Sequence, residues 1–300
     1  MKLDLAKIRQ FGNIEFLAKQ MVEGFITGLH KSPYHGFSVE FAEHKIYNSG
    51  EGTRHIDWKV YGKTDRLYTK RYEEETNLRC RILIDTSSSM YYPAENQGKI
   101  TFSIAAAASL TYMLQKQRDA VGICTFSDEL ELQTTMKSTP SHVHKLFLML
   151  QKLLDSTPKE KKTSVAPIIH QIADSTNKRS LVVIFSDMFD GGNEEEIFAA
   201  LQHLKHNKHE VLLFHVTDRA TEQEFAFEER PYEFIDIESG EKVNVKPSEV
   251  KETYTQAIQE FSQNLKLRCG QYKIDFVEAD IRAGIEGILL PYLVKRGKMR

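Results

Sequence analysis

The amino-acid sequence predicts an α/β protein built on a doubly wound, mostly parallel sheet. Two mostly apolar segments support this prediction. They are residues 79–85, which end in Asp85, and residues 180–187, which end in Asp187. Continuously apolar strands are typical of parallel sheets that are covered on both faces. From residue 79 onward strand-like and helix-like segments alternate regularly, as expected of parallel strands joined by right-handed crossovers.

The elements of this part follow from that alternation. Strand 79–85 is followed by a helix that carries the alanine run Ala105–Ala108, since alanine is the strongest helix former. The expected elements are, in chain order, strand 79–85, helix 97–116, strand 121–126, a short edge strand at 128–132, helices 141–154 and 164–175, strand 180–187, helix 194–206, strand 210–216, helix 247–266, strand 271–277 and helix 280–295.

The segment before the first core strand predicts an α+β extension. Residues 13–29 carry apolar side chains at close to helical spacing, and residues 37–47 alternate as in a strand after a turn at 31–36. We therefore expect two parts, an N-terminal extension at 1–78 and the sheet domain at 79–300.

Residues 218–246 interrupt the alternation. Segment 225–245 predicts two or three strands with a turn at 238–241, which together form a hairpin excursion near the end of strand 210–216. The excursion either helps to shape a partner surface or is a simple insertion, and the sequence leaves both readings open.

Polar side chains at the ends of the two acid-terminated strands predict a metal site. Asp85, Ser87 and Ser89 offer a carboxylate and two hydroxyls from one loop, and Asp187 adds a second carboxylate. In the doubly wound order 3-2-1-4-5-6, the first and fourth strands are neighbours, so the two acids face one crevice. The polar loop at Thr163 is placed to add a third hydroxyl. Oxygen ligands of this kind suit Mg²⁺ or Mn²⁺.

The same residues resemble a known domain family. The run from Asp85 to Ser89 resembles the Asp-x-Ser-x-Ser motif of von Willebrand factor A domains, whose metal centre is the metal-ion-dependent adhesion site; Ser88 stands where that family usually has glycine. Thr163 and Asp187 match the family's loop threonine and second aspartate. The resemblance implies a von Willebrand factor A-like fold with Rossmann-type strand order, in which the edge strand at 128–132 is antiparallel.

The segment that precedes the metal strand narrows the resemblance. A Gly-rich turn, the core Arg54-His55-Ile56-Asp57-Trp58 and a Lys-Arg-aromatic-acidic run at 70–75 are similar to the bacterial domain of unknown function 58 family. That resemblance implies a non-enzymatic adaptor that works with a MoxR-type AAA+ ATPase in chaperone-like assembly or maturation of a client protein. Membrane association would then come only through partners.

An enzymatic alternative starts from the same aspartate. Phosphatases of the haloacid dehalogenase type use a strand-end aspartate as nucleophile, but they need a second aspartate two residues later, where this chain has Ser87. A phosphate-binding Gly-rich loop, a nucleophile elbow and a dinucleotide fingerprint are also missing from the sequence. The alternative is therefore a Mg²⁺-dependent phosphatase-like hydrolase using Asp85, and we favour the non-enzymatic reading.

Composition and isolated residues exclude other classes. The net charge of −2 argues against a general nucleic-acid binder, and no apolar run approaches the ~20 residues that span a bilayer. Three scattered cysteines fit a reduced, cytoplasmic protein. The histidines at 142, 144, 203, 206 and 209 are expected on the solvated surface rather than at zinc. Trp58 favours packing over a partner contact, and the charged residues around it suit either an ion-pair network or a docking face.

Overall fold

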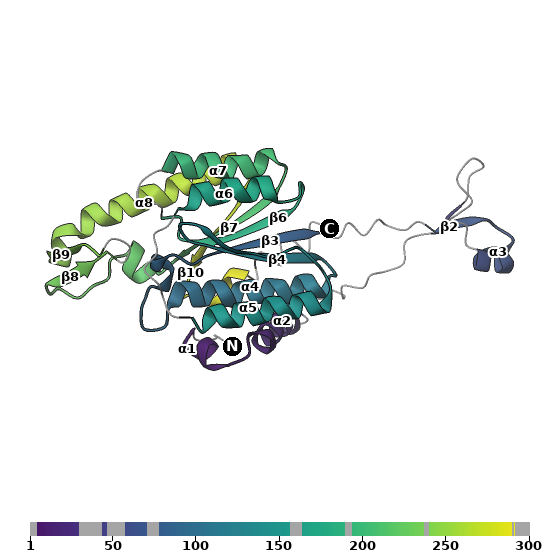
Figure 1. Ribbon diagram of the computed structural model, residues 1–300, viewed down its shortest axis with the longest axis horizontal. Coiled ribbons are helices and arrows are strands. Elements are labelled where there is room, and N and C mark those ends of the chain that lie inside the picture. Colours follow the sequence, from purple (N-terminus) through teal and green to yellow (C-terminus); the bar gives the residue numbers. More distant parts are fainter. Residues whose placement is uncertain are drawn as a thin grey trace. The chain divides into compact units, whose positions relative to one another are not determined.

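The computed structural model describes residues 5–29, 44–46, 58–70, 78–156, 164–189, 194–236, 240–289 and 291. The chain divides into two compact units (Figure 1). The larger unit contains Met1–Thr27 and Leu78–Arg300, and the smaller unit contains Gly28–Asn77. The N-terminal extension expected at 1–78 is thus divided at Thr27, and its first part belongs to the same unit as the sheet.

A six-stranded sheet forms the centre of the larger unit. Its order is β10-β7-β6-β3-β4-β5, in which β5 is antiparallel to β4 and the other neighbours are parallel. The strands are β3 (Arg79–Asp85), β4 (Ala120–Phe126), β5 (Leu130–Gln133), β6 (Leu181–Ser186), β7 (Glu210–Thr217) and β10 (Asp275–Asp280). Numbered within the sheet, this is the order 3-2-1-4-5-6, so the doubly wound fold with an antiparallel edge is confirmed.

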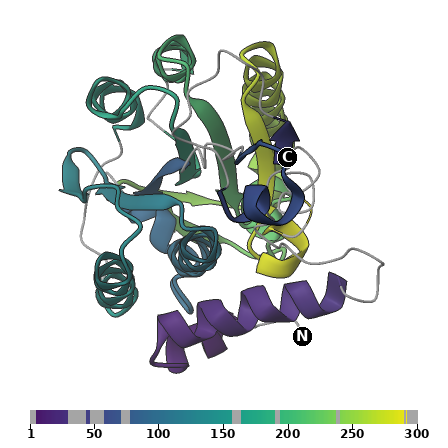
Figure 2. The same cartoon turned by 90° about the vertical axis from the view of Figure 1, so that its right-hand side faces the viewer.

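Helices cover both faces of the sheet (Figures 1 and 2). One face carries α4 (Gly98–Lys116) and α5 (Pro140–Leu154), and the other carries α6 (Val165–Ser175), α7 (Glu194–His206) and α8 (Pro247–Gln271). The pleat of β3 sends Ile82 and Ile84 into the core below α4, and Leu83 into the core below α6 and α7. Both faces are therefore covered by packed side chains, which explains why β3 is apolar from Ile82 to Ile84.

Two helices near the N-terminus pack on the side of the sheet that carries α4 and α5. They are α1 (Leu5–Gln10) and α2 (Ile14–Leu29), and their apolar residues Ile8, Leu17 and Met21 join the core around α4. The backbone N–H of Ile14 also donates a hydrogen bond to the Gln151 side chain on α5 at 2.9 Å. The helix expected at 13–29 is confirmed, and this packing is why it belongs with the sheet.

The described residues of the smaller unit form an antiparallel strand pair and a helix. The pair is β1 (His44–Ile46) with β2 (Tyr68–Lys70), and the helix is α3 (Trp58–Thr64). The strand expected at 37–47 is described only at 44–46, and Arg54 and Asp57 lie outside the described residues. The role of the segment from Arg54 to Trp58 therefore stays a prediction.

The excursion after β7 contains the expected hairpin. A π-helical turn, η3 (Arg219–Gln223), leads to β8 (Tyr232–Ile235), which pairs antiparallel with β9 (Lys242–Val245). Phe225 packs against Phe234 and Tyr254, so an aromatic cluster joins the hairpin to α8.

The last strand and the last helix begin later than the sequence predicts, whereas α8 (Pro247–Gln271) begins where it was expected. Helix α8 continues to Gln271, and the chain then turns through Lys273, whose φ is +56°, before β10 begins at Asp275. The strand expected at 271–277 was therefore placed too early, because Tyr272 and Ile274 look strand-like but lie in this turn. Of the helix expected at 280–295, residues 285–289 and 291 are helical, and the remainder beyond 289 is outside the described residues.

Both edges of the described sheet are polar. At one edge β10 carries Asp275, Glu278 and Asp280, and at the other β5 is four residues long, carries Glu131, and pairs with β4 through a register shift after Thr125. No helix among the described residues is long and apolar enough to cross a membrane. The three cysteines, Cys80, Cys124 and Cys269, are buried, and no disulfide joins any two of them.

Candidate metal centre

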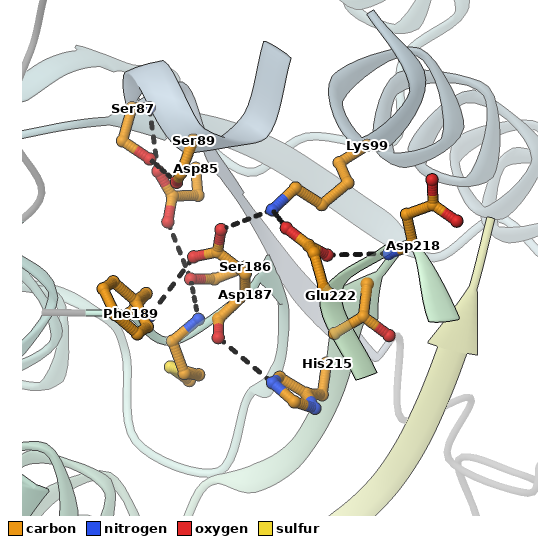
Figure 3. Close-up of polar contacts among 12 residues, drawn as sticks. Asp85, Ser87, Ser89, Lys99, Ser186, Asp187, Phe189, His215, Asp218 and Glu222 are labelled. Atoms are coloured by element: carbon orange, nitrogen blue, oxygen red, sulfur yellow. Dashed lines mark hydrogen bonds and ion pairs between the residues drawn. The ribbon is translucent and has the colours of Figure 1, made fainter. Parts of the chain in front are cut away.

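The first half of the candidate site is the loop that follows β3. Asp85 is fully buried, and its carboxylate accepts hydrogen bonds from the backbone N–H of Ser87 at 2.9 Å and from the Ser186 hydroxyl at 2.7 Å (Figure 3). The hydroxyls of Ser87 and Ser89 lie 3.1 Å apart, at the start of the short 3₁₀ turn η2 (Ser88–Tyr91). Thr86 anchors this loop to β4 by two hydrogen bonds to the Phe126 carbonyl.

The second half is the segment that follows β6. Asp187 accepts a hydrogen bond from the backbone N–H of Phe189 at 3.2 Å, and the Ser186 hydroxyl accepts one from Met188 at 2.8 Å (Figure 3). Met188 is buried with φ of +55°, a left-handed conformation that bulky residues rarely adopt. This turn directs Met188 inward and leaves Phe189 55% exposed beside the crevice.

The adjacency of β3 and β6 brings four of the five predicted ligands together. Asp85 and Asp187 lie at the ends of neighbouring strands, and the Ser89 hydroxyl is close enough to help lower the pKa of Asp187. Thr163 lies outside the described residues, as does Asp190. Sequence reasoning missed Ser186, although this hydroxyl joins the two halves by bonding to Asp85.

A lysine that the sequence analysis did not single out lies in the same crevice. Lys99, in the first turn of α4, is 1% exposed, and its ammonium lies 2.8 Å from Asp187 Oδ2 and 2.5 Å from Glu222 Oε1 (Figure 3). The sequence contains one sign of this buried lysine. Lys99 is the only charged residue of the segment 98–115, whose next charged residue is Lys116.

Glu222 extends the charged contacts away from the crevice. It lies on the π-helical turn η3, and its second carboxylate oxygen accepts a hydrogen bond from the Asp218 backbone N–H at 2.7 Å. The buried Asp218 carboxylate in turn binds the Arg282 guanidinium through two hydrogen bonds, at 2.5 and 2.8 Å. Two ion-paired clusters, joined by the Asp218 backbone N–H, therefore connect Asp187 to the turn after β10.

Comparison with known families identifies the family of this chain. Residues 43–264, most of the chain, match the family described as "Protein of unknown function DUF58". The chain belongs to the DUF58 family. The family resemblance seen in the sequence is therefore confirmed.

Curated relatives of this DUF58 chain are distant. The uncharacterized proteins Rv1480 of Mycobacterium tuberculosis and Mb1516 of Mycobacterium bovis are each 22% identical to it over 205 residues, which cover 68% of this chain and 63% of the relative. The match thus spans less than two thirds of the relatives' length.

Solved structures similar to the DUF58 chain include von Willebrand factor A-type domains. An aerotolerance-related membrane protein from Bacteroides fragilis is 14% identical with a TM-score of 0.39, covering 70% of this chain and 100% of that one. BatB from Bacteroides thetaiotaomicron is 13% identical with a TM-score of 0.38, covering 74% and 99%. A von Willebrand factor type A protein from Catenulispora acidiphila is 12% identical with a TM-score of 0.35, covering 50% and 34%.

The two acids of the DUF58 crevice have opposite electrostatic surroundings. Burial, reinforced by the negative charge of Asp187, raises the pKa of Asp85 to about 7. Burial also opposes ionisation of Asp187, but the charge and hydrogen bond of Lys99 outweigh it and hold the pKa of Asp187 below its ordinary value. The positive charge of Lys99 thus balances the negative charge of Asp187. Asp85 has no such cation beside it, so burial makes its ionised form unfavourable.

The donor set fits a hard divalent cation. Asp85, Asp187 and the hydroxyls of Ser87 and Ser89 are all oxygen ligands, and a cation between the acids would offset the buried charge of Asp85. Within the described ranges, no group of three or more His, Cys, Asp or Glu side chains could hold a metal ion, so a zinc-type cluster is not found there.

The histidines differ in part from the surface placement expected of them. His144 is exposed and lies 2.9 Å from Glu15, and His203 lies between His170 and Asp174, at 2.9 and 3.3 Å. His209 contradicts the expectation, because it is 1% exposed and accepts the Ser180 backbone N–H at 3.3 Å. Its position just before β7 buries it beside the start of β6.

Proposed function

We propose that this DUF58 protein is a non-enzymatic, metal-dependent protein-interaction module. The single observation that carries the proposal is the pair of buried strand-end acids, Asp85 and Asp187, which share one crevice with the hydroxyls of Ser87 and Ser89. The residues that would hold Mg²⁺ or Mn²⁺ are Asp85, Ser87, Ser89, Thr163 and Asp187.

The ligand types explain why such a site would bind a partner. Two carboxylates balance the charge of a divalent cation, and the remaining protein ligands are neutral hydroxyls. A bound cation would supply an electrophilic position that accepts an acidic side chain from another protein. The chain itself contributes fixed orientation, since Ser186 and the Ser87 backbone hold Asp85, and the Phe189 backbone holds Asp187.

The family resemblance supports the choice of partner. A MoxR-type AAA+ ATPase would bind the crevice, and the pair would act in chaperone-like assembly or maturation of a client protein. The three cysteines are buried and form no disulfide, which suits a reducing compartment, and we propose a cytoplasmic location on that ground. Any membrane association would come through the partners.

Metal-dependent stability tests the metal half of the proposal. Mg²⁺ or Mn²⁺ should raise the melting temperature of the wild type, because a ligand of the folded state stabilises it by RT ln(1 + [L]/Kd). The double variant Ser87→Ala/Ser89→Ala should lose this response. Ser109→Ala is the matched control, since it removes a buried hydroxyl that bonds within α4 to Ala105. Equal metal responses in all three proteins would refute the site assignment.

Capture of the partner tests the other half. A MoxR-type ATPase co-purified with the tagged protein in Mg²⁺ should be lost when a chelator is added, and lost again in Asp187→Asn. Retention of the ATPase in chelator would place the contact outside the crevice.

A further inference from the structure

Lys99 occupies a position that is unfavourable for an isolated lysine. Its side chain is almost fully buried, which penalises the ammonium, and it lies in the first turn of α4, where the helix dipole disfavours positive charge. Contacts with Asp187 and Glu222 offset both costs. The lysine is therefore held in the crevice by carboxylates, one of which is a predicted metal ligand.

The start of α4 is fixed closely enough to hold the lysine in place. Gln97 precedes the helix with φ of +47°, and a Cβ on Gly98 would lie 2.6 Å from Ile281 Cδ1 and 2.8 Å from Pro93 Cδ. Glycine at this position allows the close approach of the helix to the turn after β10. The base of the Lys99 side chain consequently has little freedom, and only its long methylene chain can adjust.

We propose that Lys99 is a built-in cation that competes with the divalent metal for Asp187. The inference rests on the proposed metal function and adds its regulation. The Lys99 ammonium lies 2.8 Å from Asp187 Oδ2. A divalent cation that binds Asp187 would therefore come close to this positively charged group. Like charges that share one carboxylate repel each other, and the repulsion weakens metal binding.

Glu222 lowers the cost of separating Lys99 from Asp187 when a metal binds. It contacts the same ammonium from the other side, and the Asp218 backbone N–H fixes its second carboxylate oxygen. When a metal occupies the crevice, Lys99 keeps a paired carboxylate instead of becoming a buried, uncompensated charge. Glu222 therefore favours the metal-bound form, and Lys99 favours the metal-free form.

The Mn²⁺ affinities of three single variants test the proposal. They are measured at one pH by calorimetry and by the loss of the electron paramagnetic resonance signal of free Mn²⁺. Lys99→Met should bind Mn²⁺ on the order of tenfold more tightly or better. Lys99→Arg keeps the charge and should bind like the wild type. Lys116→Met, the same substitution at the other end of α4 in an exposed pair with Glu23, should change nothing.

Glu222→Gln provides an independent arm that does not require the lysine to be removed. It should weaken Mn²⁺ binding in the wild type, and the effect should shrink in the Lys99→Met background because Glu222 acts through the ammonium. If the wild type binds Mn²⁺ but Lys99→Met binds it equally or more weakly, the competition is refuted and the metal site survives. If neither protein binds Mn²⁺, the proposed metal function itself fails and the competition with it.

Discussion

Replacing Asp85 with asparagine should stabilise the metal-free protein at alkaline pH. The carboxylate is fully buried beside Asp187, whereas the asparagine amide is neutral and of nearly the same shape. Asparagine can still accept the Ser87 backbone N–H, and its amide nitrogen can donate to the Ser186 hydroxyl, which are the two contacts of the native carboxylate.

The magnitude follows from the pKa of this one group. Burial raises the pKa of Asp85 from 3.8 to about 7, and each pKa unit corresponds to about 1.4 kcal/mol. The protonated side chain contributes stability that is fully present below pH 3.8 and is lost as the pH rises through about 7. The free energy of unfolding of Asp85→Asn should therefore exceed that of the wild type by an amount that grows by about 3 kcal/mol between pH 5 and pH 8.

Urea unfolding of both proteins in chelator, at these two pH values, measures the effect. Other titrating groups, including Glu222 with its raised pKa, contribute to both proteins, so the difference between the two proteins reports on Asp85. A difference that does not change with pH, or an asparagine variant that is less stable at the higher pH, would refute the reasoning. In Mg²⁺ the order should reverse if the metal is held by the carboxylate.

Three further outcomes are expected. Purified protein with Mg²⁺ or Mn²⁺ should not turn over phosphomonoesters, nucleotides or peptides, and activity that disappears in both Asp85→Asn and Asp187→Asn would revive the hydrolase alternative. Phe185→Ala should lower the free energy of unfolding by about 3–5 kcal/mol because the ring is fully buried, whereas Phe189→Ala, at an exposed ring, should change it by less than about 1 kcal/mol in the same urea titration. Thr163→Ala and removal of an acidic residue on the partner should be strongly non-additive in binding assays, and additive effects would exclude a shared metal bridge.

The fold was predictable because the decisive features are local. Strand β3 ends at Asp85, and Asp187 follows β6 directly; the doubly wound strand order then places the ends of these two strands side by side. The same rule predicted that Asp85 and Asp187 share a crevice before any distance was known. Alternation of strands and helices predicted parallel strands, and the resemblance to von Willebrand factor A domains implied the Rossmann-type order that the sheet has.

The charge of the crevice was not predictable, because it depends on residues that are far apart in the chain. A lysine such as Lys99 reads as a surface residue until Asp187 and Glu222 are placed around its ammonium. His209 was misplaced for a related reason, since its polar neighbours in sequence hide a buried contact with Ser180. Sequence patterns describe one element at a time, and these side chains are stabilised by contacts between elements.

The edges of the sheet have a consequence for how this protein meets others. The unpaired backbone groups of an exposed edge strand can pair with a strand of another chain, and this happens most readily when the edge strand is long, flat and apolar. Here β10 presents the carboxylates of Asp275 and Asp280, and β5 is short and irregular in its pairing. Both edges of the described sheet therefore discourage β-strand addition and the aggregation that follows from it at high expression.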